Sequence, residues 1–289
     1  MIPPSFDYHA PKTLPEALEL LGRFGDEAKV LSGGQSLLPL LKLRFAQPAH
    51  LVDIGRIPGL DYIKEEGGSL KIGALVREAA LEASPLVKAK YPILCDTAAV
   101  IADPIVRNLA TVAGNLAHGD PANDHPATML ALGAEVVLTG PTGSRTVPVA
   151  QFFTGLFTTA LSTTEVLSEI RIPIPPAGSG GAYVKLERKV GDFATAGAAA
   201  FLVLKGGVIE RAGIGLTNVG PMPIKASDAE KYLAGKKPDE PAFAEASRLA
   251  AAAASPSPDR RGSVEYKKEM ARVLTVRALR IAAKRAGGN

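Results

Sequence analysis

The sequence predicts an α+β protein of two domains, residues 1–176 and 177–289, the first with two lobes of about 1–55 and 56–176. Strands and helices alternate in the first domain without the regular spacing of β–α–β units, so a doubly wound sheet is not expected. The second domain shows consecutive strand patterns with a short turn, followed by a helical tail. The 289 residues, of which 46% are apolar, are enough to build these cores.

The elements of the first domain follow from local patterns. Thr13-Leu14-Pro15-Glu16 has the Thr-x-x-Glu form of a capping box and opens a helix with an apolar face. That face consists of Leu14, Ala17, Leu18 and Leu21. Short strands are predicted at residues 28–31, 51–54, 69–73, 135–139 and 146–149. Residues 76–132 have a mostly helical pattern that prolines and a glycine turn interrupt.

The second domain begins after a segment rich in proline and glycine, residues 173–181, which predicts a linker. Three antiparallel strands are expected at residues 182–188, 196–204 and 208–216, and Lys205-Gly206-Gly207 predicts a hairpin turn between the last two. Helices are expected at residues 226–233, 242–254 and 264–286. The last helix should face the core with an apolar stripe of Tyr266, Met270, Val273, Leu274, Ala278 and Ile281.

Charge and hydropathy argue against several functional classes. The net charge is +4, and the basic residues are scattered apart from a C-terminal group that predicts a solvated helix face. That group consists of Arg272, Arg277, Arg280, Lys284 and Arg285. No concentrated basic stripe indicates nucleic-acid binding. Neither a signal peptide nor a run of about 18 apolar residues is present, so we expect a cytoplasmic protein without a membrane span.

The single cysteine, Cys95, limits the redox chemistry of the chain. It excludes an intramolecular disulfide, and an iron–sulfur cluster generally requires four thiolates. Cys95 lies in the segment Tyr91-Pro92-Ile93-Leu94-Cys95-Asp96 and is expected to be a small buried apolar residue rather than a nucleophile.

Two glycine turns are the most informative functional feature. Ser32-Gly33-Gly34-Gln35-Ser36 follows an apolar strand, and Thr111-Val112-Ala113-Gly114-Asn115 follows Arg107-Asn108. Glycine allows the backbone to approach a phosphate closely, and N–H groups and short hydroxyls can donate to its oxygens. Neither turn has the Walker or Rossmann spacing. Either turn alone would be an ordinary β-turn, whereas the two together predict a phosphate site.

These turns resemble the two FAD-diphosphate loops of the flavoprotein (medium) subunits of molybdenum hydroxylases, of the carbon monoxide dehydrogenase and xanthine dehydrogenase type. Ile105-Val106-Arg107-Asn108 and the stretch Ala117-His118-Gly119-Asp120-Pro121-Ala122-Asn123-Asp124-His125-Pro126 extend the resemblance, which covers nearly the whole chain. Ala113 stands where the family commonly has glycine, and its Cβ would be strained if this position required positive φ. The resemblance implies a two-lobed FAD-binding domain of the vanillyl-alcohol oxidase type. A three-stranded antiparallel sheet with a helical bundle follows that domain.

The resemblance also implies a set of FAD-binding residues: Leu31, Ser32, Gly33, Gly34, Gln35, Ser36, Thr111, Val112, Ala113, Gly114, Asn115, Ala117, Asp124, Leu167, Lys185 and Phe193. Asp124 either faces sugar hydroxyls of FAD or caps the helix that starts near Pro126. Lys185 either lies near the pyrimidine end of the flavin, where it would favour the anionic reduced form, or is a solvent-exposed strand residue. Phe193 would shield the flavin ring, and Leu167 either touches the flavin or belongs to the core.

No catalytic triad or paired general acid and base is evident, and His118, Asp120, Asp124 and His125 fit no standard zinc spacing. The resemblance therefore implies an electron-transfer subunit of a heterohexamer, whose chemistry belongs to FAD. An iron–sulfur small subunit and a molybdenum-cofactor large subunit would be its partners, and a quinone, NAD or oxygen its external acceptor. Two alternatives stay open: a free-standing FAD-dependent oxidoreductase of the same fold superfamily, and a non-catalytic protein without FAD. The substrate of the complex also stays open among carbon monoxide, heteroaromatic compounds and aldehydes.

Overall fold

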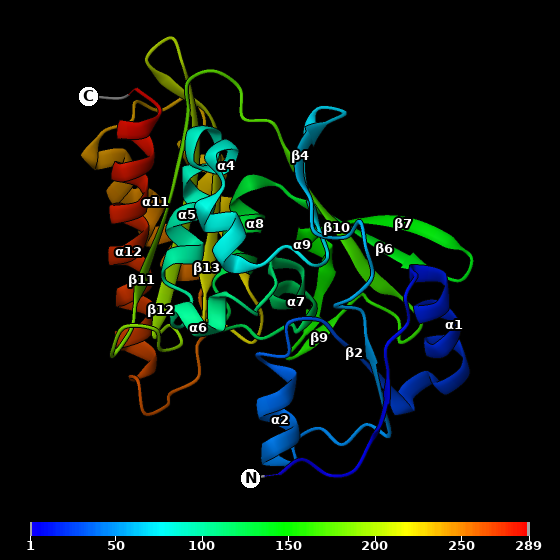
Figure 1. Cartoon of the computed structure of the whole chain (residues 1–289). Helices are drawn as coiled ribbons and strands as arrows, with labels where there is room; N and C mark the ends of the chain where they lie inside the picture. Colours follow the sequence, from blue (N-terminus) through cyan, green and yellow to red (C-terminus); the bar gives the residue numbers. More distant parts are fainter. Residues whose placement is uncertain (1, 288–289) are drawn as a thin grey trace.

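The computed structural model describes residues 2–287, which contain three larger sheets, a two-stranded hairpin and helices that pack against the sheets (Figure 1). The outermost residues of the two predicted domains, 1 and 288–289, lie outside the described residues. Within the described part, no helix has the length and apolar character needed to cross a membrane. The α+β class is confirmed, with antiparallel sheets and one small parallel sheet.

The first sheet is parallel, in the order β1 (Asp7–His9), β3 (His50–Asp53) and β2 (Ala28–Leu31). Helix α1 (Leu14–Phe24) begins as the capping box predicts, because Thr13 Oγ1 accepts a hydrogen bond from the Glu16 amide at 3.3 Å. Its buried residues are Ala17, Leu18 and Leu21. Strand β2 ends where the first glycine turn starts, and α2 (Leu37–Leu43) follows that turn.

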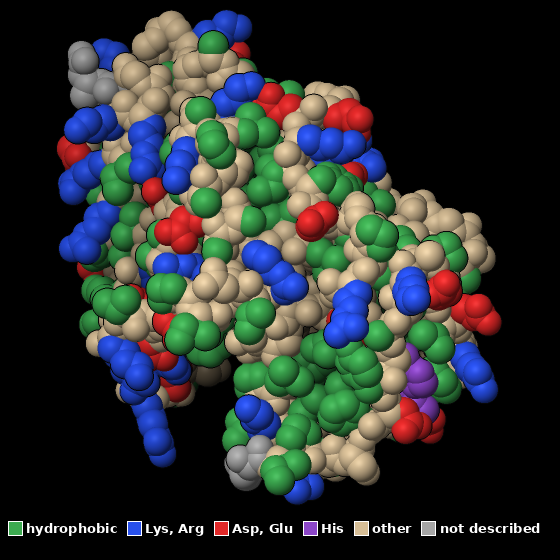
Figure 2. Space-filling model, in the orientation of Figure 1, with side chains coloured by type: hydrophobic (Ala, Val, Ile, Leu, Met, Phe, Trp, Pro, Cys, Tyr) green, Lys and Arg blue, Asp and Glu red, His purple; other side chains and the backbone are tan. Residues whose placement is uncertain are grey.

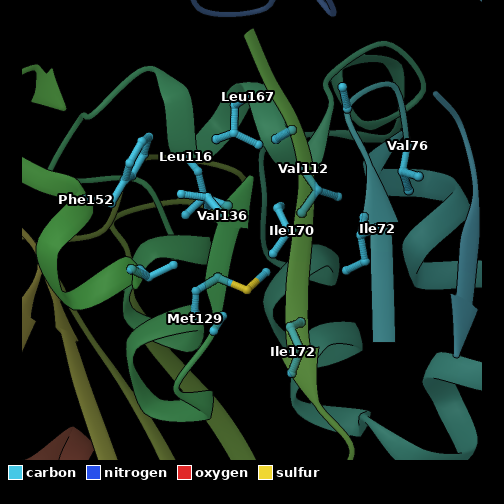
Figure 3. Close-up of a cluster of buried hydrophobic side chains, with 14 of the residues drawn as sticks. Ile72, Val76, Val112, Leu116, Met129, Val136, Phe152, Leu167, Ile170 and Ile172 are labelled. Carbon is cyan, nitrogen blue, oxygen red and sulfur yellow. The ribbon is translucent and has the colours of Figure 1, made fainter. Parts of the chain in front are cut away.

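The second sheet is antiparallel and has five strands in the order β4 (Ile63–Glu66), β5 (Ser69–Gly73), β10 (Val166–Pro173), β6 (Glu135–Gly140) and β7 (Gly143–Pro148). Between β5 and β6 lie α3 (Glu78–Ala83), α4 (Pro85–Lys90), α5 (Pro92–Ala99), α6 (Pro104–Arg107), α7 (Val112–Ala117) and α8 (His125–Leu132). Helix α9 (Val149–Phe152) leads from β7 to a hairpin of β8 (Phe153–Gly155) and β9 (Thr158–Thr159). Figure 3 shows the core where Val112 and Leu116 of α7 meet Ile170 of β10.

The third sheet has four antiparallel strands rather than the predicted three. They are β11 (Ser179–Leu186), β12 (Ala196–Lys205), β13 (Val208–Thr217) and β14 (Ile224–Lys225). The fourth strand has two residues, paired with Gly215 and Leu216 of β13. The prediction missed it because so short a strand, directly after Pro221-Met222-Pro223, has no alternating pattern.

Helices α10 (Ser227–Leu233), α11 (Glu240–Ala253) and α12 (Val264–Arg285) cover one side of this sheet, and α5 and α8 lie on the other (Figure 1). The prediction of a linker over 173–181 was wrong for Ser179–Gly181, which begin β11. A Cβ on Gly180 would collide with the Ala282 carbonyl oxygen of α12. This glycine therefore permits close contact between helix and strand instead of providing a flexible joint.

The predicted apolar stripe of α12 is wrong at its two ends, because Tyr266 is 44% exposed and Ile281 is 40% exposed. Small residues dominate the face that packs on the sheet. The buried residues of the helix are Lys267, Ala271, Leu274, Thr275, Ala278, Leu279, Ala282 and Ala283. The close approach at Gly180 explains the difference, since large side chains would hold α12 away from β11.

Candidate functional site

The two glycine turns lie against each other although they are far apart in the sequence. Ser32 Oγ is 3.1 Å from Thr111 Oγ1. A Cβ on Gly33 would collide with the Leu109 carbonyl oxygen and would lie 2.8 Å from Ala110 Cα. Gly34 has φ +75°, a conformation that glycine adopts without strain. The glycines thus allow the turns to form one continuous surface.

The second turn is held by its own helix and by the chain behind it. Thr111 caps α7, because its Oγ1 accepts a hydrogen bond from the Gly114 amide at 3.2 Å. The Val112 amide donates to the Val76 carbonyl oxygen at 3.0 Å. Ala113 lies inside α7 and is not among the residues with positive φ. The expected strain at Ala113 therefore does not arise, and alanine suits its helical position.

A cavity of about 930 Å³ opens beside both turns, within the 300–1,000 Å³ range usual for cofactor and ligand sites. Its wall includes twelve of the sixteen predicted FAD-binding residues: Leu31, Ser32, Gly33, Gly34, Gln35, Ser36, Thr111, Ala113, Gly114, Asn115, Ala117 and Leu167. Val112, Asp124, Lys185 and Phe193 are not part of the wall. Val112 is fully buried in the core instead (Figure 3). Leu167 is buried and belongs both to the core and to the cavity wall.

Sequence reasoning missed one side of the cavity. Phe157, Thr158 and Thr159 come from the hairpin of β8 and β9, and residues 161–163 follow it. Phe157 has φ +52°, which is uncommon for a bulky residue. Its ring centroid is 5.4 Å from that of His118, and both side chains line the cavity. Burial lowers the pKa of His118, so its neutral form is favoured in the folded chain.

The residues around the cavity fit a diphosphate-containing cofactor. Asn115 Oδ1 is buried and has no hydrogen-bond partner among residues 2–287, so it is available to a bound group. The Asn115 carbonyl oxygen is already used, because it accepts from Asn123 Nδ2 at 2.7 Å. The residues of the turns that line the cavity carry hydroxyl and amide side chains and no carboxylate. Glu165, which also lines the cavity, is paired with Arg145 at 2.7 Å.

Asp124 and Lys185 form a buried pair next to this site. Lys185 Nζ lies 3.0 Å from Asp124 Oδ2, and the two side chains are 2% and 7% exposed. Asp124 Oδ1 accepts from the Tyr183 hydroxyl at 2.6 Å, and Lys185 also donates to the Val100 carbonyl oxygen at 2.9 Å. Burial raises the pKa of Asp124, whereas Lys185 and Tyr183 lower it. The alternative of a solvent-exposed Lys185 is therefore wrong. Asp124 occupies the cap position of α8 without making a side-chain capping bond.

Comparison with known families agrees with this geometry. Residues 4–175 match the model of the FAD-binding domain in molybdopterin dehydrogenase, and residues 181–282 match the C-terminal domain of the carbon monoxide dehydrogenase flavoprotein. The chain belongs to the FAD-binding medium subunits of the molybdenum hydroxylases. Its first domain is an FAD-binding domain, and the family is one of oxidoreductase subunits.

Relatives of this family match along almost the whole chain. The carbon monoxide dehydrogenase medium chain of Hydrogenophaga pseudoflava is 49% identical over 98% of both chains. That of Afipia carboxidovorans is 48% identical over 99% of both. A solved structure of the Hydrogenophaga pseudoflava enzyme contains a chain with a TM-score of 0.96 and 50% identity, covering 99% of each chain. Quinoline 2-oxidoreductase from Pseudomonas putida gives a TM-score of 0.92 at 35% identity and the same coverage.

In this family member, Phe193 lies on a loop that other residues anchor. It is 49% exposed, in the connection between β11 and β12. Burial opposes ionisation of Asp192, but hydrogen bonds from Arg188 and Arg261 lower its pKa to about 2. Gly191, with φ +83°, approaches Ala102 so closely that a Cβ would lie 2.7 Å from the Ala102 carbonyl oxygen. The loop is thus fixed against the first domain while Phe193 stays accessible.

Neither Cys95 nor any group of His, Cys, Asp and Glu side chains within residues 2–287 has surroundings that favour redox or metal chemistry. Cys95 is half-buried rather than buried, with Sγ 3.8 Å from the Glu82 carbonyl oxygen. Burial raises the pKa of its thiol, which disfavours the nucleophilic thiolate. Within residues 2–287, no three His, Cys, Asp or Glu side chains are grouped to hold a metal ion. On the face of the molecule shown in Figure 2, Lys and Arg side chains are spread over the surface with acidic side chains between them, so no concentrated basic patch is seen there.

Proposed function

We propose that this subunit transfers electrons within a complex of the carbon monoxide dehydrogenase type. Its partners would be an iron–sulfur small subunit and a molybdenum-cofactor large subunit, and an external quinone, NAD or oxygen would be its acceptor. Bound FAD supplies the redox chemistry of this chain. The main support is the match to two carbon monoxide dehydrogenase medium chains over at least 98% of their length. Carbon monoxide is the favoured substrate of the complex because both are more similar than a 6-hydroxypseudooxynicotine dehydrogenase subunit at 38% identity.

We propose that the two turns hold the FAD diphosphate, since residues of both turns, with hydroxyl and amide side chains among them, line one cavity. Asn115 Oδ1 would accept a hydrogen bond from a donor of FAD. Ala113, Ala117 and Leu167 would contribute apolar contacts to the cofactor. Gln35 supports the first turn from within, because its Nε2 donates to the Gly33 carbonyl oxygen at 3.3 Å.

We further propose that Asp124, Lys185 and Phe193 act at the flavin end of the site. Lys185 belongs to β11 and Asp124 precedes α8, so their contact joins the two predicted domains beside the cavity. Because Asp124 is bonded to both Tyr183 and Lys185, its effect on FAD would come through this network rather than through a direct sugar contact. Phe193 would cover the flavin from its anchored loop.

The domain boundary at 176/177 is also a proposal, which the gap between the two family matches at 175 and 181 supports. The parallel sheet and the five-stranded sheet would be the two lobes of a vanillyl-alcohol oxidase-type domain. A free-standing flavoenzyme is less favoured, because the relatives that match the full length are chains or subunits of larger dehydrogenases.

Reconstitution tests the proposed function. The purified chain should contain FAD but oxidise no carbon monoxide. Mixing it with the small and large subunits of Hydrogenophaga pseudoflava carbon monoxide dehydrogenase should yield carbon monoxide-dependent reduction of a dye acceptor. The two subunits without this chain are the control. Turnover by this chain alone at about 1 per second or faster would support a free-standing enzyme. A chain that binds no FAD would contradict the proposal altogether.

A further inference from the structure

Glu78 and His125 form a buried polar pair outside the cavity. Both side chains are fully buried, and Glu78 Oε2 lies 2.7 Å from His125 Nε2. Glu78 Oε1 and His125 Nδ1 have no partners among residues 2–287. Neither residue belongs to the cavity wall. Burying ionisable groups with incomplete hydrogen bonding lowers the free energy of unfolding. A pair of apolar side chains at these two positions would therefore stabilise the fold more than Glu78 and His125 do.

Glu78 lies directly behind the second turn. It is the first residue of α3, and its amide donates to the Ala110 carbonyl oxygen at 3.0 Å. The preceding residue, Arg77, forms a β-bridge with Thr111, and its guanidinium donates to the Leu109 carbonyl oxygen. The backbone of residues 76–78 is therefore bonded to residues 109–112. These hydrogen bonds couple the position of Glu78 to the position of the turn that lines the cavity.

His125 begins α8, which contacts outside that turn also hold in place. Every residue of α8 is buried. The helix packs closely on β13, because Cβ atoms on Gly213 and Gly215 would collide with carbonyl oxygens of α8. Asp124, which precedes His125, is bonded to Tyr183 and Lys185 of β11. The pair thus joins the start of α3, directly behind the second turn, to a helix whose residues are all buried.

We propose that Glu78 and His125 are positioning residues for FAD. Their contact fixes the start of α3 relative to α8, and α3 holds the turn at residues 109–115 through backbone hydrogen bonds. The turn is thereby kept in the arrangement that brings Thr111 next to Ser32 before any cofactor arrives. Preorganisation of this kind strengthens binding by removing an ordering cost. This proposal deepens the proposed function, because it assumes that the turn binds FAD.

The test compares Glu78→Ala, Glu78→Gln and a matched control in the full chain. Glutamine keeps an oxygen that can accept a hydrogen bond from His125 Nε2–H. The control is Thr97→Val, which removes another buried contact to α8, the 2.7 Å pair of Thr97 and Thr128 hydroxyls, without touching the second turn. Hydrogen exchange is measured at residues 109–115 in the FAD-free chain, and the FAD dissociation constant and melting temperature are measured for each variant.

Glu78→Ala should accelerate exchange at residues 109–115 and raise the FAD dissociation constant about tenfold. Glu78→Gln should keep both the exchange rate at residues 109–115 and the FAD dissociation constant close to those of the unmodified chain. Thr97→Val should lower the melting temperature but change neither the exchange at residues 109–115 nor the FAD dissociation constant to a large extent. Normal exchange at residues 109–115 in a folded Glu78→Ala chain would overturn the proposal, as would equal acceleration in Thr97→Val. If Glu78→Ala does not fold, His125→Gln is judged by the same exchange measurement. Because exchange is followed without FAD or partners, its outcome is separate from that of the reconstitution experiment.

Discussion

A Gly33→Asp chain is expected to fold and to lose its bound FAD. A side chain at this position meets the Leu109 carbonyl oxygen and the Ala110 Cα, so the two turns must separate. The added carboxylate would also face the phosphates that the turns are proposed to hold. The flavin absorbance of the purified chain should fall to background, while circular dichroism stays close to that of the unmodified chain. Gly114→Asp should behave alike, because a Cβ there would lie 2.6 Å from the capping Thr111 Oγ1.

The matched control for this experiment is Gly22→Asp. Gly22 is an exposed residue of α1, and a Cβ there meets no atom within 4 Å. The same charge is thus added without moving either turn, and flavin content should be unchanged. Full flavin occupancy in both Gly33→Asp and Gly114→Asp would mean that the turns have only a structural role.

The two turns could be predicted from the sequence because their chemistry is local. Glycine and hydroxyl residues occur next to each other, and the structure places both segments at one cavity. The opposite wall could not be predicted, because Phe157 and Thr159 come from a hairpin whose second strand has two residues. Such a strand has no periodicity to detect, and its position depends on contacts with Gly119.

Glycine was informative in one setting and misleading in another. At Gly33, polar neighbours predicted close approach of the backbone to a phosphate, and the structure shows that this glycine also permits close contact with the backbone of Leu109 and Ala110. At Gly180, proline and glycine neighbours pointed to a flexible linker, although the residue permits contact with α12. The sequence alone does not show which distant backbone a missing side chain makes room for.

Buried polar pairs were the least predictable part of the site. Asp124 and Lys185 are 61 residues apart, and Glu78 and His125 are 47 apart. The sequence around these four residues gives no sign of either pairing, since Asp124 and His125 are neighbours in the chain and Glu78 follows Arg77. Pairing depends on the packing of α3, α8 and β11, which no local pattern specifies. Tyr183 was missed for the same reason, because its hydroxyl bonds with Asp124 and Thr217 from within a strand.

Lys185→Met should destabilise the chain by about 3–5 kcal/mol, the usual effect of removing one partner of a buried ion pair. Asp124 would keep the Tyr183 hydrogen bond but lose the cation that balances its charge. Thermal or denaturant unfolding of the FAD-free chain measures the loss. The exposed pair of Arg272 and Glu269 provides the control, and Arg272→Met should have little effect.

The pH dependence of this variant identifies the cause. Burial raises the pKa of Asp124, and removing Lys185 takes away the largest opposing influence. With a folded-state pKa above the unfolded value, Asp124 is tolerated when protonated and costs stability as the pH rises through the folded pKa. Lys185→Met should therefore lose less stability at pH 5 than at pH 8. Adding Asp124→Leu should recover part of the loss at pH 8, because Asp124 then carries no charge and only Glu187, whose carboxylate lies 3.4 Å from Lys185 Nζ, has lost its cation. An equal loss at both pH values, with no recovery in the double variant, would show that packing of the Lys185 side chain matters and its charge does not.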